Sequence, residues 1–174
     1  MQQSIAFVGF MGSGKSTVAK LLAKAMDLQF VDLDLTIEEQ EKQSISEIFK
    51  SHSEDYFRKI ETQILKEVLS ESRPRVISCG GGTILSKRNR ALLSKECLVV
   101  YLEADDKLLL DRLKHAKSER PLIADKSEEE LLDFIRTELN SRMKFYQQAD
   151  FSIQASKAKA SIQELKKKLL NYSK

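Results

Sequence analysis

The sequence predicts an α/β fold of three layers, with one parallel sheet of five strands between two layers of helices. The first observation is that short apolar runs alternate along the chain with segments of helical periodicity, as in successive strand–helix units. The second is that the 174 residues contain no internal repeat, low-complexity stretch or linker, and this length suits one domain. We therefore expect a single domain over residues 1–174. Its sheet should be parallel and covered on both faces, because strands joined by helices pair in parallel.

Five apolar runs are predicted to be strands because each is short and is bounded by turn or helix signals. They cover residues 5–8, 29–32, 75–79, 97–103 and 151–155. In open α/β sheets, ligands bind beyond the carboxyl ends of the strands. The loops expected to carry function therefore follow Val8, Asp32, Cys79 and Glu103.

Helices are predicted where apolar residues recur three or four positions apart. In residues 15–26, for example, the apolar face consists of Val18, Leu21, Leu22 and Ala25. Capping boxes indicate where two of the helices begin, at Ser44 with Glu47 and at Ser127 with Glu130. The predicted helices are residues 15–26, 44–49, 54–70, 86–94, 105–115, 127–148 and 158–172.

The segment between the first strand and the first helix reads GFMGSGKST, from Gly9 to Thr17. It matches G-x-x-x-x-G-K-[ST], the P-loop, in the strand-then-helix context that this motif requires. The glycines let backbone N–H groups turn around phosphate oxygens, and the helix adds the positive end of its dipole. Lys15 would reach the β- and γ-phosphates and Ser16 would bind Mg²⁺. The sequence therefore predicts a nucleoside triphosphate site, since a simple glycine turn would need neither residue.

Two carboxylates, Asp32 and Asp34, stand at the end of the second strand. They point the same way if the strand continues through Asp34, and both would then face the phosphate site. One would hold Mg²⁺ through a water molecule, and the other would accept a proton from an acceptor alcohol. The alternative interpretation is a helix cap or a solvated turn, and the pair alone does not decide between them.

Two arginines are candidate ligands for an anionic substrate. Glu61 follows Arg58 at a spacing of three, which would hold the guanidinium for bidentate binding, although the spacing alone favours an ordinary surface ion pair. Arg142, near the end of the long helix at 127–148, is open to the same two interpretations. The three glycines at 80–82 indicate a ligand more strongly. Glycines are entropically costly, and three in a row are expected where the backbone must approach a ligand closely and donate N–H groups.

The polar segment at about 116–126 is predicted to be a loop that closes over the site as a lid. It contains Arg120 in the sequence Arg-Pro-Leu. Phosphoryl-transfer enzymes often supply an arginine from a closing loop, where it neutralises charge in the transition state. The arginine on its own supports this role only weakly.

Composition limits the classes of function. The net charge is only +3, with 41% hydrophobic and 32% charged residues, which argues against a dedicated nucleic-acid binder. Two cysteines are too few and too far apart for a disulfide framework or a zinc site. No apolar stretch is long enough to span a bilayer, and the first residues lack the pattern of a secretory signal. We expect a cytoplasmic protein that binds neither nucleic acid nor membrane, and we take it to be a monomer.

Taken together, these motifs resemble the shikimate kinase family over nearly the whole chain. The matching segments are GFMGSGKST at 9–17, FVDLD at 30–34, ISEIF at 45–49, E-x-x-F-R-x-x-E at 54–61, GGG at 80–82, RPL at 120–122 and R-x-x-x-Y-x-x-x-A-D at 142–150. Many families share the P-loop, whereas this combination in this order is specific. Two positions depart from the family: Ser53 stands where a glycine is usual, and the loop after the last strand lacks a proline.

The resemblance implies transfer of the γ-phosphoryl group of ATP to the 3-hydroxyl of shikimate, in the pathway to chorismate and the aromatic amino acids. It implies that Asp34 holds the ring hydroxyls and acts as the base, and that Arg58 and Arg142 bind the carboxylate. Glu61 would orient Arg58. The implied shikimate ligands are Asp34, Arg58, Glu61, Gly80, Gly81, Gly82 and Arg142.

The resemblance also implies a nucleotide and metal site. Lys15 and Arg120 would stabilise the transferring phosphoryl group, and Ser16 would bind Mg²⁺ with Asp32 behind a bound water. Arg112 would stack on the adenine, whose other side would face the loop after the last strand. The implied ATP ligands are Gly12, Ser13, Gly14, Lys15, Ser16, Thr17, Arg112, Arg120 and Ser156.

Two rival functions remain at this point. One is a small-molecule kinase of the same architecture that acts on gluconate or a nucleoside monophosphate, because arginine ligands suit gluconate as well. The other is a P-loop switch protein, which would hydrolyse nucleotide slowly and would need no acceptor site. Phosphorylation that depends on an added acceptor separates all of them.

Overall fold

One parallel sheet organises the molecule, in a computed structural model that describes residues 3–115, 123–155 and 158–170. The strand order is β2-β3-β1-β4-β5, and every neighbouring pair is parallel. The strands are β1 (Ser4–Val8), β2 (Gln29–Asp32), β3 (Arg75–Ser78), β4 (Cys97–Glu103) and β5 (Phe151–Gln154). The predicted α/β class and its five parallel strands are confirmed, and all the carboxyl ends lie at one edge of the sheet.

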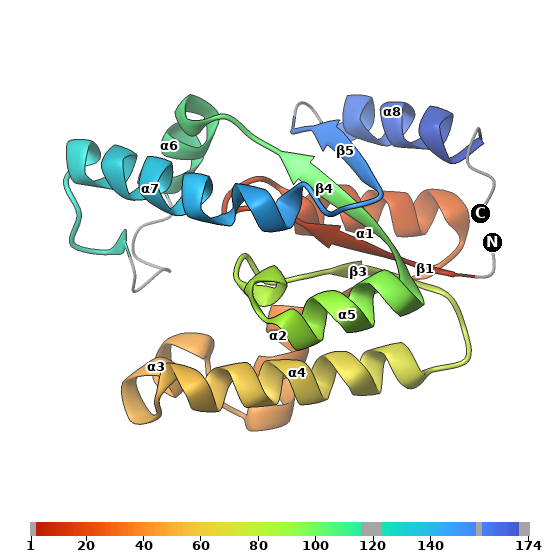
Figure 1. Ribbon diagram of the computed structural model, residues 1–174, viewed down its shortest axis with the longest axis horizontal. Coiled ribbons are helices and arrows are strands. Elements are labelled where there is room, and N and C mark those ends of the chain that lie inside the picture. The colour runs from red at the N-terminus through yellow and green to blue at the C-terminus, as the bar shows by residue number, and fades with distance from the viewer. Residues whose placement is uncertain (1–2, 116–122, 156–157, 171–174) are drawn as a thin grey trace.

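Helices cover both faces of this sheet, which makes three layers (Figure 1). The helices are α1 (Lys15–Met26), α2 (Leu33–Glu41), α3 (Ile45–Ser51), α4 (Glu54–Ser70), α5 (Lys87–Glu96), α6 (Asp106–Lys114), α7 (Glu128–Tyr146) and α8 (Ala158–Leu170), with a 3-10 turn, η1 (Thr83–Leu85). Figure 1 shows α1 and α8 on one side of the sheet and α4 and α5 on the other. No helix in the described part of the chain is long and apolar enough to cross a membrane.

Each face of the sheet has its own apolar core. Along β1, Ile5 and Phe7 join the core under α1, α6 and α8, whereas Ala6 and Val8 join the core under α2, α4 and α5. This alternation follows from the period of two in a strand, and a strand buried on both faces is apolar throughout. Burial of both faces fixes the register of β1, and with it the position of the loop that follows Val8.

Side-chain caps begin several helices where the sequence predicts them. Both capping boxes are present, at Ser44 with Glu47 and at Ser127 with Glu130. Ser53, which stands in place of the family's glycine, caps α4 by accepting a hydrogen bond from the backbone N–H of Tyr56. Serine is at least as good an N-cap as glycine, so this departure leaves the start of α4 well defined.

The second strand ends earlier than the prediction for Asp34 required. β2 stops at Asp32, and Leu33 begins α2, a helix that the sequence analysis missed. The Asp32 carboxylate accepts a hydrogen bond from the backbone N–H of Asp34 at 3.2 Å and so caps the helix, while Leu33 and Ile37 bury its inner face. Asp32 and Asp34 therefore do not share one side of an extended strand. The helix-cap interpretation is correct for Asp32, and Asp34 lies in the first turn of α2.

Candidate functional site

The P-loop forms a tight turn at the carboxyl edge of the sheet, between β1 and α1. Gly12 and Gly14 have φ angles of 79° and 96°, in the left-handed region where a side chain would be strained. Gly14 is also the N-cap of α1. The Lys15 ammonium donates a hydrogen bond to the carbonyl oxygen of Phe10 at 3.0 Å, and Lys15 is only 8% exposed. Its charge is thus held inside the loop, at the positive end of the helix dipole.

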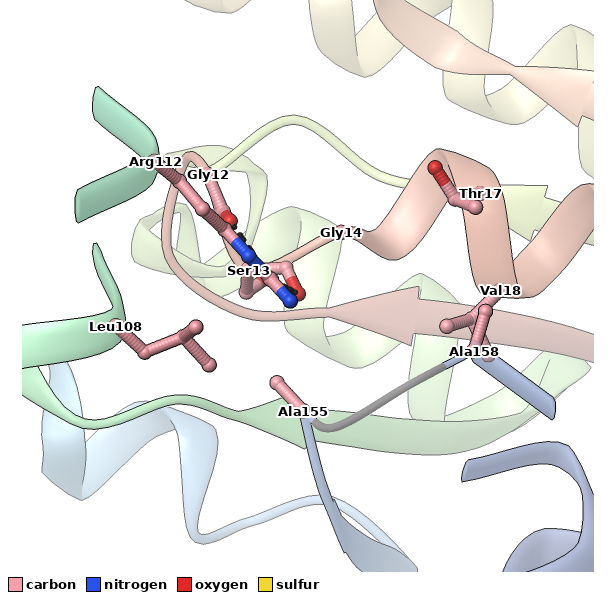
Figure 2. Close-up of a pocket in the computed structure, with 9 residues that line it drawn as sticks. All are labelled: Gly12, Ser13, Gly14, Thr17, Val18, Leu108, Arg112, Ala155 and Ala158. Atoms are coloured by element: carbon pink, nitrogen blue, oxygen red, sulfur yellow. Dashed lines mark hydrogen bonds between the residues drawn. The ribbon is translucent and has the colours of Figure 1, made fainter. Parts of the chain in front are cut away.

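A cavity of about 650 Å³ lies beside the P-loop and suits a nucleotide (Figure 2). Arg112, from α6, donates two hydrogen bonds from Nη1, to the carbonyl oxygens of Gly12 at 3.1 Å and Ser13 at 2.7 Å. The guanidinium therefore ties α6 to the P-loop at the wall of the cavity. The cavity is lined by Gly12, Ser13, Gly14, Thr17, Val18, Leu108, Arg112, Ala155 and Ala158.

A second cavity, of about 260 Å³, joins the P-loop to the first turn of α2 and the end of β3. Its lining includes Lys15, which the sequence analysis assigns to the phosphates of the nucleotide, and Asp34, which it assigns to the acceptor. The lining residues are Met11, Gly12, Gly14, Lys15, Ser16, Thr17, Asp34, Ser78, Cys79 and Gly81. A terminal phosphate and an acceptor hydroxyl would meet in this space.

The environment of Asp34 perturbs its carboxyl group. Burial raises the pKa of Asp34 to about 6; the positive charge of Lys15 opposes this rise, and the negative charges of Asp32, Glu61 and Glu38 add to it. A carboxylate with a pKa near 6 is a better proton acceptor than an ordinary aspartate and is still ionised at neutral pH. Perturbed groups of this kind are typical of active sites.

Arg58 lies against the glycine turn at 80–82. Its Nη1 donates to the Glu61 carboxylate at 3.1 Å, and its Nη2 and Nε donate to Glu54. Glu61 is 1% exposed, so this is not the solvated ion pair that the spacing favoured. A Cβ atom on Gly82 would lie 2.5 Å from Nη2 of Arg58, so only glycine leaves room for the guanidinium.

Arg142 reaches the same turn from α7. Its Nη1 donates to the carbonyl oxygen of Gly81 at 3.3 Å, and the Tyr146 hydroxyl donates to that oxygen at 2.9 Å. The Arg142 guanidinium also pairs with Glu138 one helical turn earlier, while its Nε is buried and has no hydrogen-bond partner among the described residues. Arg58 and Arg142, which are far apart in the sequence, thus approach one glycine turn from two helices. Asp34 approaches it from a third.

The oxygen groups near the P-loop fit a magnesium ion. Ser16 Oγ lies 3.1 Å from Ser78 Oγ, where β3 ends, and both residues line the smaller cavity. Mg²⁺ in nucleotide sites takes one or two protein oxygens together with phosphate oxygens and waters, so a serine hydroxyl suffices as an anchor. Asp32 caps α2 beside this cavity without lining it, which suits a contact through water better than direct coordination.

Two of the predicted site residues, Arg120 and Ser156, lie outside the described residues, as does most of the predicted lid. The other predicted ATP ligands lie at the P-loop or at the wall of the larger cavity, and the predicted acceptor ligands lie around the glycine turn.

A model of the shikimate kinase family matches residues 11–172 of the chain. The shikimate kinase of Flavobacterium johnsoniae is 43% identical over 152 residues, which cover 87% of this chain and 88% of that protein. The chain belongs to the shikimate kinase family. The family resemblance that the motifs predicted is confirmed, and with it the class of ATP-dependent phosphotransferases.

Solved structures agree with the family assignment. The shikimate kinase of Bacteroides thetaiotaomicron has a TM-score of 0.88 at 33% identity, over 98% of this chain and 99% of that one. A shikimate kinase from Acinetobacter baumannii, solved in complex with shikimate, has a TM-score of 0.89 at 32% identity, over 98% and 94%. A gluconokinase from Sinorhizobium meliloti reaches a TM-score of 0.57 at 21% identity, over 99% and 98%, and so shares the fold alone.

The shikimate kinase motifs did not reveal every residue that shapes the site. Ser78 and Tyr146 received no role in the sequence analysis, although Ser78 contacts Ser16 and Tyr146 holds the Gly81 carbonyl. Glu138 carries a weak signal, a spacing of four from Arg142. Asn89, buried behind Arg58, carries none.

Proposed function

We propose that this member of the shikimate kinase family transfers the γ-phosphoryl group of ATP to the 3-hydroxyl of shikimate, giving shikimate 3-phosphate and ADP. The observation that carries the proposal is the convergence of Asp34, Arg58 and Arg142 on the glycine turn at 80–82, beside the P-loop. The shikimate complex of the relative from Acinetobacter baumannii, at 32% identity, supports the same acceptor.

The acceptor is held by its carboxylate. Arg58 and Arg142 present guanidinium groups to it, and such groups bind carboxylates bidentately. Glu61 holds Arg58 in place through a buried ion pair, and Glu138 holds Arg142. The backbone at Gly80 and Gly81 packs against the ring in this proposal, and Gly81 lines the smaller cavity.

The chemistry rests on Asp34 and Lys15. Asp34 accepts the proton of the acceptor hydroxyl, a task that its raised pKa favours. Lys15 and the N-terminus of α1 stabilise the negative charge of the transferring phosphoryl group. Ser16 binds Mg²⁺, which neutralises phosphate charge when bound. Arg120 adds a further positive charge in this proposal.

The nucleotide base and sugar occupy the larger cavity. Arg112 forms one wall, fixed by its two hydrogen bonds to the P-loop backbone, and presents its planar guanidinium to the adenine. Thr17 and Val18 of α1 form part of the wall beside the P-loop. Ser156, which lies outside the described residues, is a further ATP ligand in this proposal.

The test is release of ADP, followed in a coupled spectrophotometric assay with shikimate, gluconate or a nucleoside monophosphate as the acceptor. We expect release that depends on shikimate and only background rates with the other two. The Lys15→Met variant, which lacks the ammonium, should lose turnover by at least about a thousandfold. Release with gluconate or nucleoside monophosphate alone, or slow release that no acceptor accelerates, would refute the proposal.

We further propose that the protein acts as a cytoplasmic monomer. The described residues of one chain supply both cavities and the acceptor ligands, so the site does not depend on a second copy. Light scattering during size-exclusion chromatography should give the mass of one chain, about 19.9 kDa. A mass twice as large would contradict it.

A further inference from the structure

A buried polar network lies behind the acceptor site, between α4, α5 and η1. Its central residue is Asn89 in the first turn of α5, which is 0% exposed. The Asn89 amide nitrogen donates to the backbone carbonyl oxygen of Thr83 at 3.2 Å and to Oε2 of Glu61 at 3.4 Å. The Thr62 hydroxyl lies 2.7 Å from the amide oxygen and 2.9 Å from the Arg58 carbonyl oxygen, and it donates its one proton to either of them. Asn89 therefore connects three elements without lining either cavity of the site.

Only one orientation of the Asn89 amide satisfies its neighbours. Glu61 and the Thr83 carbonyl present acceptor oxygens only, so they require the NH2 group. If the amide were rotated by half a turn, its oxygen would face two other oxygens inside a region without solvent. Such a mismatch is costly in a buried position, so Glu61 and the Thr83 carbonyl together select the orientation of the amide.

Glu61 depends on these donors because its charge is buried. Its carboxylate receives hydrogen bonds from Arg58 Nη1 at 3.1 Å, from the Thr83 hydroxyl at 2.6 Å and from Asn89 at 3.4 Å. Glu54, the other carboxylate on Arg58, has a side chain that is 67% exposed and gives weak, solvent-screened restraint. The position of the Arg58 guanidinium therefore follows from the position of the Glu61 carboxylate.

We propose that Asn89 is a positioning residue for acceptor binding, which acts through Glu61 on Arg58. Asn89 fixes one edge of the Glu61 carboxylate, and Glu61 sets the guanidinium in place before the acceptor arrives. This role rests on the proposed function, because it presumes that Arg58 binds the acceptor carboxylate. Losing the amide leaves Glu61 with two donors and lets the Glu61–Arg58 pair move away from the glycine turn.

The first experiment compares steady-state constants of Asn89→Ala and wild type with shikimate and ATP as varied substrates. We expect the KM for shikimate to rise about tenfold, the effect of one buried hydrogen bond to a charged group, with kcat and the KM for ATP within about twofold. Leu93→Val is the matched control, because Leu93 is 0% exposed one turn further along α5 and touches the apolar core instead. It should lower the Tm without changing either KM.

Two further comparisons separate positioning from general loosening. Thr62→Val removes the hydroxyl that contacts the Asn89 amide oxygen and the Arg58 carbonyl oxygen, and it should raise the shikimate KM. Thr62→Ser keeps the hydroxyl and should have the shikimate KM of wild type. In an Arg58→Ala background, Asn89→Ala should change kcat/KM for shikimate by less than about twofold, because the guanidinium that Asn89 positions is then absent. This ratio comes from the linear slope at low shikimate and does not require saturation.

The proposal is overturned if Asn89→Ala raises both KM values alike, leaves the shikimate KM unchanged, or keeps its full effect without Arg58. An equal effect of Thr62→Val and Thr62→Ser would also count against it. A wild-type protein that does not phosphorylate shikimate would instead refute the proposed function, so the two failures are distinct.

Discussion

A Cβ atom on Gly80 would lie only 2.6 Å from Oδ1 of Asp34. The contact involves the far end of a side chain, so a methyl group at this position displaces the carboxylate rather than the backbone. We expect Gly80→Ala to lower kcat by at least about tenfold, because a misplaced base loses proton transfer, and to leave the Tm nearly unchanged. Steady-state kinetics and a thermal melt check both expectations. A large loss of Tm with normal kcat would show that Gly80 serves the fold instead.

Gly82 has the same relation to Arg58 that Gly80 has to Asp34. A Cβ atom there would lie 2.5 Å from Nη2 of Arg58. Gly82→Ala should therefore raise the KM for shikimate while affecting kcat less than Gly80→Ala does, because it moves a binding group and not the base. The same assay with both variants tests this contrast, and equal kcat losses would contradict it.

Arg58→Ala should raise the KM for shikimate on the order of a hundredfold, since it removes a charged ligand and leaves Glu61 buried without its cation. The KM for ATP should change by less than about threefold, because Arg58 does not line the larger cavity. Initial rates with each substrate varied in turn measure both constants. Equal losses on the two substrates would rule out the role of a carboxylate ligand.

The raised pKa of Asp34 predicts an acid limb in the pH profile. The carboxyl group loses its proton near pH 6 in the free protein, so kcat/KM for shikimate should fall as the pH drops through about 6. Lys15 lowers this pKa, so Lys15→Met should move it upward, which NMR titration of the carboxyl carbon would detect. A titration near pH 4 in both proteins would contradict the prediction.

The same shift has a consequence for stability. The folded state binds the Asp34 proton more tightly than the unfolded state does, so this group favours folding most at low pH, and its contribution declines as the pH rises toward 6. Above that range the ionised carboxylate opposes folding. Asp34→Asn should accordingly have a higher Tm than wild type at pH 8, while the two should differ less at pH 4.

Arg112→Ala should raise the KM for ATP about tenfold and leave the KM for shikimate unchanged. The substitution removes one wall of the larger cavity and two hydrogen bonds to the P-loop backbone. Arg136→Ala is a suitable control. Arg136, in α7, forms an exposed ion pair with Asp106 at the start of α6, the helix that carries Arg112. If both variants weakened ATP binding equally, the effect would come from α6 as a whole.

The sequence predicted the parts of the molecule that local patterns encode. The P-loop, the capping boxes and the five strands each depend on residues close together in the chain, and they appear where expected. The whole of α2 was missed because Asp32 and Asp34 resemble a continuing strand, whereas Leu33 and Ile37, four positions apart, have the spacing of a helix.

Local sequence patterns could not predict which side chains are buried behind the site. Arg58 and Glu61 show the spacing of a surface ion pair, and only the fold reveals that Glu61 is 1% exposed. Asn89 contacts Thr62, which is 27 positions away, and no motif marks either residue. Tertiary contacts of this kind arise from the packing of α4 against α5, and the periodicity of apolar residues does not predict which helices pack together.

The two apolar cores support different parts of the proposed site. The elements around the larger cavity, chiefly α1, α6 and α8, rest on one core, while Asp34, Arg58 and the glycine turn rest on the other. Helix α7, which carries Arg142, packs on both. A change that repacks one face of the sheet therefore reaches mainly one of the two Michaelis constants. In the proposed reaction, the binding of the acceptor could therefore be altered by substitutions in one core with little effect on the binding of the phosphate donor.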